Sequence, residues 1–384
     1  MKLKLLIVGA GMYVCGRGTD GFGTVLPSLY EAYRCGLIER VDVIATRPAS
    51  IQGLMEKNNR LNERMGFGFP VHGHSGADAY RRALKEIKPD CVIISVPDHL
   101  HARVAIQAAN AGSHVLVVKP LAPTAKEAKE MIQAAQKNQV YGAVEFHKRF
   151  DDANLKIRDM FSQGKLGDLL YIVVNYSQRK IIPQQMFKDW SNKTNIFQYL
   201  GVHYADLIYF VTGAKPIRVM ATGQKQWLTA KGIATHDAIQ VVIEWSLGKK
   251  EFTSIIATNW IDPNTSSAMS DQKISLVGTK GRIDSDQKNR GVQIVTDENG
   301  IEDFNPYFSQ LYTDTTGQTV FRGYGERSIH QFLRDVSNIK LGVQKPKDLR
   351  NFRPTFEQGL VSTAIIEAVG VSLKKNNVWV NVRG

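Results

Sequence analysis

The sequence predicts an α/β domain with a doubly wound parallel sheet, followed by an α+β domain built on a large antiparallel sheet. Strand-like and helix-like patterns alternate regularly up to about residue 147, and parallel strands need such crossover helices between them. After residue 148, strand-like patterns follow one another through short turns, which is typical of antiparallel pairing. The chain has 384 residues, of which 43% are hydrophobic, so it can bury two cores. We place the domains at 1–147 and 148–384.

The first half reads as strands and helices in turn. Its apolar runs are short and nearly continuous, as expected for parallel strands that are covered on both faces. The expected strands lie at residues 3–11, 40–46, 90–97, 114–120 and 140–146, and the expected helices at 25–36, 78–89, 101–112 and 125–138.

The second half has a different rhythm. A "GKK" turn at 248–250 divides the strand pattern at 237–260 into two strands that we expect to pair in antiparallel fashion. The other expected strands lie at 169–180, 217–228, 273–286 and 291–297, and the expected helices at 152–164, 195–210, 325–341 and 355–374.

Composition excludes several classes of protein. The formal net charge of +13 is spread along the chain, and no nucleic-acid-binding motif accompanies it, so we expect it to attract an anionic small ligand. The N-terminal apolar run is too short for a signal peptide, and we find no segment of about 20 uninterrupted apolar residues. The three cysteines are widely spaced, which favours a reducing compartment. We therefore expect a cytoplasmic protein without a membrane or nucleic-acid partner.

A candidate nucleotide site follows the first strand. Gly9-x-Gly11, followed by Met12, stands where a dinucleotide-binding loop needs glycines for a tight turn and for close approach to a pyrophosphate. Val14 occupies the place of the third glycine of that fingerprint. The second strand ends at Thr46 and Arg47, where an NAD-specific protein usually carries an acidic residue. A hydroxyl beside a guanidinium suits a 2′-phosphate better, so we favour NADP over NAD, although Arg47 alone is also explained as a surface charge.

Further polar residues follow the later strands of the first half. In open α/β sheets, ligands bind beyond the carboxyl ends of the strands, so these residues should converge. The His-x-His pairs at 72/74 and 99/101 lack a matching acidic or cysteine cluster, and we expect no metal. The candidates are Val96, Pro97, His99, His101, Lys119, His147, Lys148 and Arg149.

In order and spacing, these segments resemble the Gfo/Idh/MocA family, named for glucose-fructose oxidoreductase, inositol dehydrogenase and rhizopine catabolism. The resemblance spans nearly the whole chain. It implies a Rossmann domain that binds NAD or NADP, with Val96, Pro97, His101 and Lys119 beside the cofactor. It also implies oxidation or reduction of a sugar or cyclitol hydroxyl, and a homo-oligomer (dimer or tetramer) formed through the sheets. The matching segments are Gly9-x-Gly11, the family's T-P-x-x-x-H at 96–101, its E-K-P at 118–120 and its D-x-G-x-H-x-x-D helix at 199–206.

The resemblance assigns a catalytic or orienting role to Lys119 and proton transfer to His203. Removing hydride from a carbinol carbon requires a base for the hydroxyl proton, and a nearby cation stabilises the alkoxide-like charge. Two residues depart from the family pattern, because Val118 replaces the glutamate of E-K-P and Tyr199 replaces the first aspartate of the helix. Tyr199 lies one helical turn before His203, so its phenol either shares the substrate hydroxyl as a third catalytic group or only packs in the wall of the site.

Substrate contacts are expected from both halves. Cationic side chains indicate a polyol or sugar that carries a carboxylate or phosphate. The expected contacts are Lys119, His147, Arg149, Tyr176, Arg179, Trp190 and His203.

The leading hypothesis is an NAD(P)-dependent dehydrogenase or reductase for a sugar, sugar acid, nucleotide sugar or cyclitol. NAD-dependent glycoside cleavage through transient oxidation and a non-catalytic cofactor-binding sensor are the alternatives.

Overall fold

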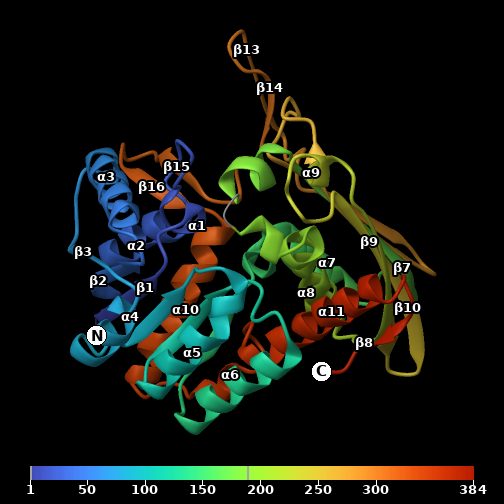
Figure 1. Cartoon of the computed structure of the whole chain (residues 1–384), viewed down its shortest axis with the longest axis horizontal. Coiled ribbons are helices and arrows are strands. Elements are labelled where there is room, and N and C mark those ends of the chain that lie inside the picture. Colours follow the sequence, from blue (N-terminus) through green and yellow to red (C-terminus); the bar gives the residue numbers. More distant parts are fainter. Residues whose placement is uncertain (1, 188–189) are drawn as a thin grey trace. The chain divides into compact units, whose positions relative to one another are not determined.

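The computed structural model describes residues 2–187 and 190–384, which form two units with separate interiors (Figure 1). The first unit consists of residues 1–122, 126–150 and 307–359, and the second of residues 123–125, 151–306 and 360–384.

The first unit is built on a six-stranded sheet in which all paired strands are parallel. The strand order β3-β2-β1-β4-β5-β6 reverses direction at β1, as in the doubly wound dinucleotide-binding fold. The parallel α/β domain expected from the sequence is thereby confirmed. Its strands are β1 (Leu3–Val8), β2 (Ile38–Ala45), β3 (Val71–Ser75), β4 (Cys91–Ile94), β5 (His114–Val118) and β6 (Gly142–Glu145).

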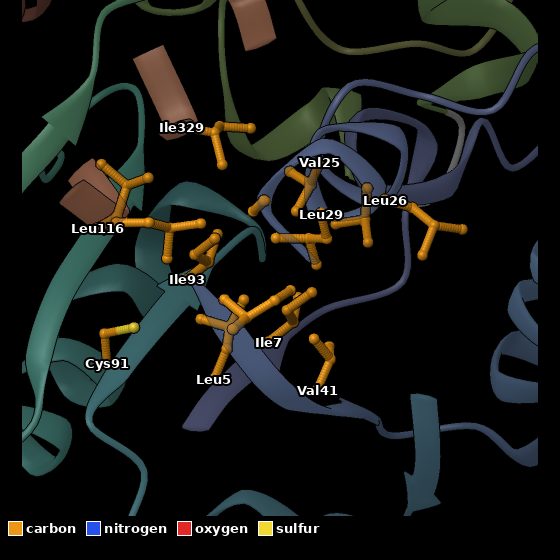
Figure 2. Packing of buried hydrophobic residues seen from close by; sticks show 14 of the residues in the cluster. Leu5, Ile7, Val25, Leu26, Leu29, Val41, Cys91, Ile93, Leu116 and Ile329 are labelled. Carbon is orange, nitrogen blue, oxygen red and sulfur yellow. The ribbon is translucent and has the colours of Figure 1, made fainter. Parts of the chain in front are cut away.

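The core of this unit forms where the central strands meet their crossover helices. Leu5 and Ile7 of β1 and Ile93 of β4 are fully buried, and Val25 and Leu29 pack toward them (Figure 2). Strands enclosed in this way tolerate few polar side chains, which explains the continuous apolar runs in the sequence. The helices of the unit are α1 (Met12–Cys15), α2 (Val25–Arg34), α3 (Pro48–Met65), α4 (Ala79–Glu86), α5 (His101–Asn110), α6 (Ala125–Lys137) and α10 (Tyr324–Lys340), with short 3-10 turns η1 (Asp98–Leu100), η2 (His147–Phe150) and η6 (Pro346–Leu349).

The second unit is built on a seven-stranded sheet with the order β12-β11-β7-β10-β9-β8-β17. The strands pair in antiparallel fashion except for β7 and β10, which run parallel, so the sheet is mixed at one pair. The parallel pair arises because the chain returns from β7 to β10 through a long crossover that contains two α-helices and two further strands. Its strands are β7 (Leu169–Arg179), β8 (Lys215–Gln224), β9 (Ala238–Leu247), β10 (Lys250–Asp262), β11 (Ser270–Gly278), β12 (Arg282–Asp286) and β17 (Val380–Asn381).

Alternation along β10 separates the two faces of this sheet. Phe252, Ser254, Ile256, Thr258 and Trp260 are all buried, whereas the residues between them reach solvent. One face therefore carries the interior of the unit. The helices of the unit are α7 (Asp152–Ser162), α8 (Val202–Thr212), α9 (Trp227–Ala230) and α11 (Phe356–Lys374), together with the π-helical turns η3 (Ile182–Met186) and η5 (Phe197–Gly201) and the 3-10 turn η4 (Ser191–Lys193).

Two short ribbons follow the large sheet, namely β13 (Val292–Thr296) with β14 (Gly300–Phe304), and β15 (Gln310–Thr313) with β16 (Thr319–Arg322).

The chain returns to the first unit after residue 306, which a single boundary at 147/148 does not describe. The reason is α10, whose Ile329, Phe332, Leu333 and Val336 are buried in the core of the first unit (Figure 2 shows Ile329). The helical pattern at 325–341 was expected, but its partner sheet was not, because periodicity says which face is apolar and not what covers it.

Helix α11 is long and apolar enough, by length and composition alone, to cross a membrane. Glu357 and Glu367 interrupt it, so it is not the run of about 20 uninterrupted apolar residues that the sequence was expected to lack. Of its most apolar window, 56% is buried inside the structure, and core helices of soluble proteins satisfy the same criteria.

Candidate functional site

The turn after β1 requires glycine for two different reasons. Gly9 has φ +117°, and a Cβ there would lie 2.0 Å from the Ser95 carbonyl oxygen at the end of β4. Gly11 is different, because a Cβ there would meet no atom within 4 Å. Packing within the protein does not demand glycine at position 11, whereas close approach of a pyrophosphate to the backbone does. Gly11 and the adjacent Met12, which opens α1, therefore fit a dinucleotide.

The missing third glycine has a local explanation. Val14 lies in α1, a helix of one turn, and its side chain is fully buried in the core. The chain then forms a second, tightly folded loop. A Cβ atom at Gly16 or Gly23 would collide with nearby backbone atoms, so the loop needs glycine at both positions. The later glycines at 16 and 23 thus serve this extra loop.

The end of β2 presents Thr46 and Arg47 to solvent. Arg47 is the N-cap residue of α3. A second guanidinium approaches the same helix, because Arg17 Nη1 donates a hydrogen bond to Ser50 Oγ at 2.9 Å. Sequence analysis missed Arg17, which belongs to the extra glycine loop; no sequence signal ties that loop to the end of β2.

His101 joins the turns that follow β4 and β5. Its ring is 1% exposed, with Nδ1 2.8 Å from the Pro120 carbonyl oxygen and Nε2 2.9 Å from the Val96 carbonyl oxygen. Both ring nitrogens are engaged by the protein. His101 therefore positions the segments of Val96–Pro97 and Lys119–Pro120, and its ring has no nitrogen left for a direct cofactor contact.

Lys119 directly follows β5 and is half-buried. Burial lowers the pKa of Lys119 to about 8, and the negative charges of Asp98 and Glu145 limit the decrease. An amine with such a pKa changes its charge near neutral pH, which is a common property of functional lysines.

A buried carboxylate that sequence analysis missed, that of Glu145, lies at the end of β6. Glu145 is 1% exposed, and its two oxygens contact His147 Nδ1 at 3.0 Å and Ser328 Oγ at 2.5 Å. Burial alone would raise the pKa of Glu145, but the His147 ring and the hydrogen bonds outweigh it and hold that pKa below its ordinary value. The signal was present in the sequence, because an acidic residue that ends the buried strand "YGAVE" needs partners.

His147 is 8% exposed and lies among aromatic rings. The centroids of Tyr13, Phe308 and Tyr324 are 6.3, 5.1 and 5.7 Å from that of His147. The register of β5 and β6 brings this segment close to Lys119, because Glu145 on β6 pairs with Val118 on β5, the residue before Lys119. His147 therefore lies beside the Lys119 segment, with its orientation set by Glu145.

Arg149 is 5% exposed and donates a hydrogen bond to Gln358, while Lys148 is 2% exposed. Both side chains are held inside the first unit. Arg149 therefore has a hydrogen-bond partner within its own unit, and its contact with a substrate stays a prediction.

In the second unit, His203 is the second residue of α8 and is 3% exposed. Its ring lies 6.4 Å from that of Tyr176 on β7, and Tyr176 in turn packs edge-on against Tyr204 at 5.6 Å. Burial raises the pKa of Tyr176, so this phenol is neutral at physiological pH. The structure thus brings together two of the expected residues, His203 and Tyr176.

Tyr199 lies in another environment, because the turn before α8 is π-helical over Phe197–Gly201. The extra residue in a π-helical turn breaks the i, i+4 alignment of a regular α-helix. Its ring packs instead against Phe187, Trp190 and Trp260, with centroid distances of 4.8, 6.0 and 5.7 Å. The expectation that Tyr199 lies one regular α-helical turn before His203 is therefore corrected.

Arg179 and Trp190 complete the expected set. An Arg179 Nη2 hydrogen bond reaches the Ser266 carbonyl oxygen, whereas Arg179 Nε is buried without a hydrogen-bond partner among residues 2–187 and 190–384. Trp190 packs on Phe187 at 4.6 Å, as part of the aromatic cluster around Tyr199.

The expected residues thus form one group in each unit. In the first, the turns that carry Gly9, Val96, Lys119 and His147 follow β1, β4, β5 and β6, which are neighbours in the sheet, and Thr46 follows β2 on the other side of β1. In the second, His203 and Tyr176 lie between α8 and β7.

The chain matches two models of known protein families. Residues 37–146 match the oxidoreductase family GFO_IDH_MocA with its NAD-binding Rossmann fold, and residues 154–284 match the GFO/IDH/MocA C-terminal domain. Together these segments make up more than half of the chain.

Individual relatives are more distant. Inositol 2-dehydrogenase of Rhizobium meliloti (strain 1021) is 23% identical over 310 residues, which is 78% of this chain and 85% of that protein. D-glucoside 3-dehydrogenase of Escherichia coli (strain K12) is 26% identical over 208 residues, covering 52% of this chain and 54% of the relative.

Among solved structures, scyllo-inositol dehydrogenase from Lactobacillus casei, with bound NAD(H) and scyllo-inositol, superposes with a TM-score of 0.69 at 18% identity and covers 100% of this chain and 99% of its own.

With both halves matched in their order along the chain, and with the Rossmann strand order and the Gly11 turn in place, this protein is an oxidoreductase of the Gfo/Idh/MocA family.

Proposed function

We propose that this protein transfers a hydride between NADP or NAD and a hydroxyl-bearing carbon of a sugar, sugar acid, nucleotide sugar or cyclitol. The position of Lys119 is the observation that carries the proposal. It follows β5, two strands from the Gly9–Gly11 turn in the order β1-β4-β5, so it stands on the edge of the sheet where the nicotinamide of a dinucleotide lies.

Each of two residues has a defined task. When bound, the nicotinamide supplies or accepts the hydride. His203 takes the proton of the substrate hydroxyl as the carbonyl forms, and returns it in the reverse direction. The ammonium of Lys119 orients that hydroxyl and stabilises the negative charge that develops on its oxygen.

Tyr199 has a packing role in this proposal. Its ring is one of four in the aromatic cluster with Phe187, Trp190 and Trp260, which supports a function in shape and not in proton transfer.

The cofactor preference is for NADP. Two guanidinium groups support it, because Arg47 caps α3 directly after β2 and Arg17 binds Ser50 of the same helix. Paired guanidinium groups bind a 2′-phosphate with charge-assisted hydrogen bonds that the 2′-hydroxyl of NAD cannot offer.

The substrate carries a carboxylate or a phosphate in this proposal. Support comes from Arg179, whose buried Nε has no partner among the described residues and would donate to an anionic oxygen. Inositol 2-dehydrogenase and D-glucoside 3-dehydrogenase, the relatives, indicate the polyol and sugar class.

We propose a homo-oligomer that forms through the outer face of the seven-stranded sheet. Ile255 and Tyr171 on that face are 42% and 44% exposed, and covering them would stabilise an interface. The cysteines at 15, 35 and 91 are free, which supports a reducing, cytoplasmic setting.

The test is an assay of sugars, uronates, sugar phosphates, cyclitols and nucleotide sugars with NADP and NAD in parallel. We expect steady formation or consumption of reduced nicotinamide with an anionic sugar, and a preference for NADP that Arg47→Ala and Arg17→Ala each reduce by about tenfold. Tight binding of NAD alone would overturn the cofactor assignment. Product formation without net change in reduced nicotinamide would point to glycoside cleavage instead.

The joint role of Lys119 and His203 is tested by Lys119→Met, His203→Asn and the double variant. If both act on one transition state, the double variant loses far less than the product of the single losses. Strictly multiplicative losses would contradict a shared site.

A further inference from the structure

An acidic arm formed by residues 291–304 extends from the second unit. The ribbon of β13 and β14 projects away from the seven-stranded sheet of its own unit (Figure 1). It carries four acidic side chains (Asp297, Glu298, Glu302 and Asp303) and no basic one. Asp303 accepts hydrogen bonds from Ser267 and Gln293 of its own chain, so Asp297, Glu298 and Glu302 are the three exposed carboxylates. It lies beyond residue 284, where the match to the model of the family's C-terminal domain ends.

This acidic arm is also unusually apolar for an exposed ribbon. Val295 and Ile301, 67% and 55% exposed, face each other in register, and Val292 and Ile294 are 42% and 40% exposed. A two-stranded ribbon with both faces in water is marginally stable by itself. Exposed apolar strand pairs of this kind mark surfaces that bind a partner.

A surface of opposite character lies in the first unit. This basic loop, residues 341–352, follows α10 and exposes Leu341, Val343 and Phe352 by 56%, 73% and 72%. Around them stand three exposed cations, Lys345, Lys347 and Arg350, against one acidic residue within the loop, Asp348. Arg350 also forms a half-exposed ion pair with Glu357 at 3.4 Å. The basic loop also lies outside both matched family segments.

We propose that the acidic arm of one copy binds the basic loop of a second copy of this chain. Charge selects the partner, because an arm of four negative charges belongs to a chain whose net charge is +13, so the rest of the chain carries +17. The same negative charge disfavours nucleic acid and anionic membranes as partners. Each surface supplies apolar side chains that the other can cover, and a two-fold pair of chains makes the contact twice. The proposal is independent of the reaction and of the sheet-mediated association.

Charge reversal with rescue tests the proposal. The arm variant is Asp297→Lys with Glu298→Lys and Glu302→Lys, and the loop variant is Lys345→Glu with Lys347→Glu and Arg350→Glu. Sedimentation velocity at low salt should show that each variant raises the dissociation constant of self-association by about tenfold or more. Combining both sets in one chain should return it to within about threefold of the unmodified protein.

The matched control reverses three exposed lysines of α6, in Lys126→Glu with Lys129→Glu and Lys137→Glu. It changes the net charge as much as the loop variant does, and we expect it to alter the dissociation constant less than about threefold. A control as damaging as the loop variant, unchanged association in the arm and loop variants, or failure of the combined set would each overturn the proposal.

Proximity is tested by a short bis-maleimide between Val295→Cys and Val343→Cys in a Cys35→Ser background, since Cys35 is the exposed native thiol while Cys15 and Cys91 are buried. With a mixture of ¹⁴N- and ¹⁵N-labelled chains, we expect linked peptides of mixed isotope composition. Links within one chain only, or no links at all, would contradict arm exchange.

Discussion

The two units hold their functional groups in different ways. In the first, the residues that matter stand in the turns after neighbouring parallel strands, so topology alone sends them to one edge. In the second, His203 is enclosed between a helix and the sheet, and its neighbours depend on how aromatic rings pack. The comparison teaches that residues at the ends of parallel strands are positioned by the sheet itself. The direction of a side chain on a helix depends on whether each preceding turn is α-helical or π-helical.

The largest effect should come from the second unit, where one enclosed group performs proton transfer. We expect His203→Asn to lower kcat by about 10²–10⁴-fold while KM changes little, because the amide still fits the space but cannot take the proton. Steady-state kinetics with Tyr209→Phe, a change on the same helix, provides the control. A His203→Asn enzyme within tenfold of normal turnover would remove the proposed role.

Glycine-to-alanine substitutions compare how much stability each unit loses when a Cβ atom is added at a close contact. Gly9→Ala should reduce the free energy of unfolding by about 3 kcal/mol, because its Cβ meets backbone at a positive φ. Gly201→Ala places its Cβ 2.3 Å from the Phe197 ring, a side chain that can shift, and should cost about 1–2 kcal/mol.

Gly11→Ala is the control for both changes, since no atom lies within 4 Å of its Cβ. It should leave stability within about 0.5 kcal/mol and weaken cofactor binding. Urea denaturation and cofactor titration measure the two quantities; equal stability loss at positions 9 and 11 would contradict the packing account.

Glu145→Gln removes a negative charge at the end of a strand in the first unit while keeping the shape of the side chain, so it tests how that charge affects Lys119. Burial lowers the pKa of Lys119 to about 8, and the Glu145 charge limits that decrease. If the ammonium is the active form, kcat/KM falls as pH rises through about 8. Removing the carboxylate then moves this alkaline limb to lower pH, by about half to one unit.

Moving the carboxylate to a neighbouring position tests whether any negative charge near Lys119 raises its pKa, or only that of Glu145. Val118 pairs with Glu145 across the two strands, so adding Val118→Glu to Glu145→Gln should move the limb back toward its original pH. Activity that rises through pH 8 in the unmodified enzyme would show that the neutral amine is the active form.

Lys119→Met supplies the stability counterpart of this prediction. The pKa of Lys119 is lower in the folded than in the unfolded chain, so burying the ammonium costs free energy fully below pH 8, and this cost fades between pH 8 and the ordinary lysine range. Lys119→Met should therefore be more stable than the unmodified protein at pH 7, with the difference shrinking above pH 8. Thermal melts across this range measure it, and a less stable variant at pH 7 would contradict it.

The smallest effect is expected at Tyr199, whose ring packs in an aromatic cluster and not on a helical face shared with His203. Tyr199→Phe keeps the ring in contact with Phe187, Trp190 and Trp260, so kcat should stay within about threefold. A loss of two orders of magnitude with an unchanged melting curve would restore Tyr199 as a catalytic group.

Much of the first unit was accessible from the sequence. The alternating patterns predicted the parallel sheet, and they placed Gly9, Gly11, Lys119 and His147 after its strands, where the structure has them. Glu145 was overlooked because the surrounding letters look like an ordinary buried strand. The hydrogen bond that Arg149 donates to Gln358, more than 200 residues away, could be seen only in the structure.

The second unit was less accessible for a physical reason. A π-helical turn differs from an α-helical one by a single hydrogen-bond shift, which no periodicity in "NIFQYLGVH" reveals. Similarly, the sequence predicted that α10 has an apolar face, but it did not predict that this helix packs in the first unit.

The sequence by itself determined the family, the parallel α/β class of the first unit and the residue types available at positions 119 and 203, because residue types and their spacing are local properties. Only the tertiary structure decided the neighbours of each group, namely Glu145 beside His147, Tyr176 beside His203 and an aromatic cluster around Tyr199. Those neighbours come from segments far apart in the chain, and the packing that joins them depends on the shapes of side chains across the whole unit.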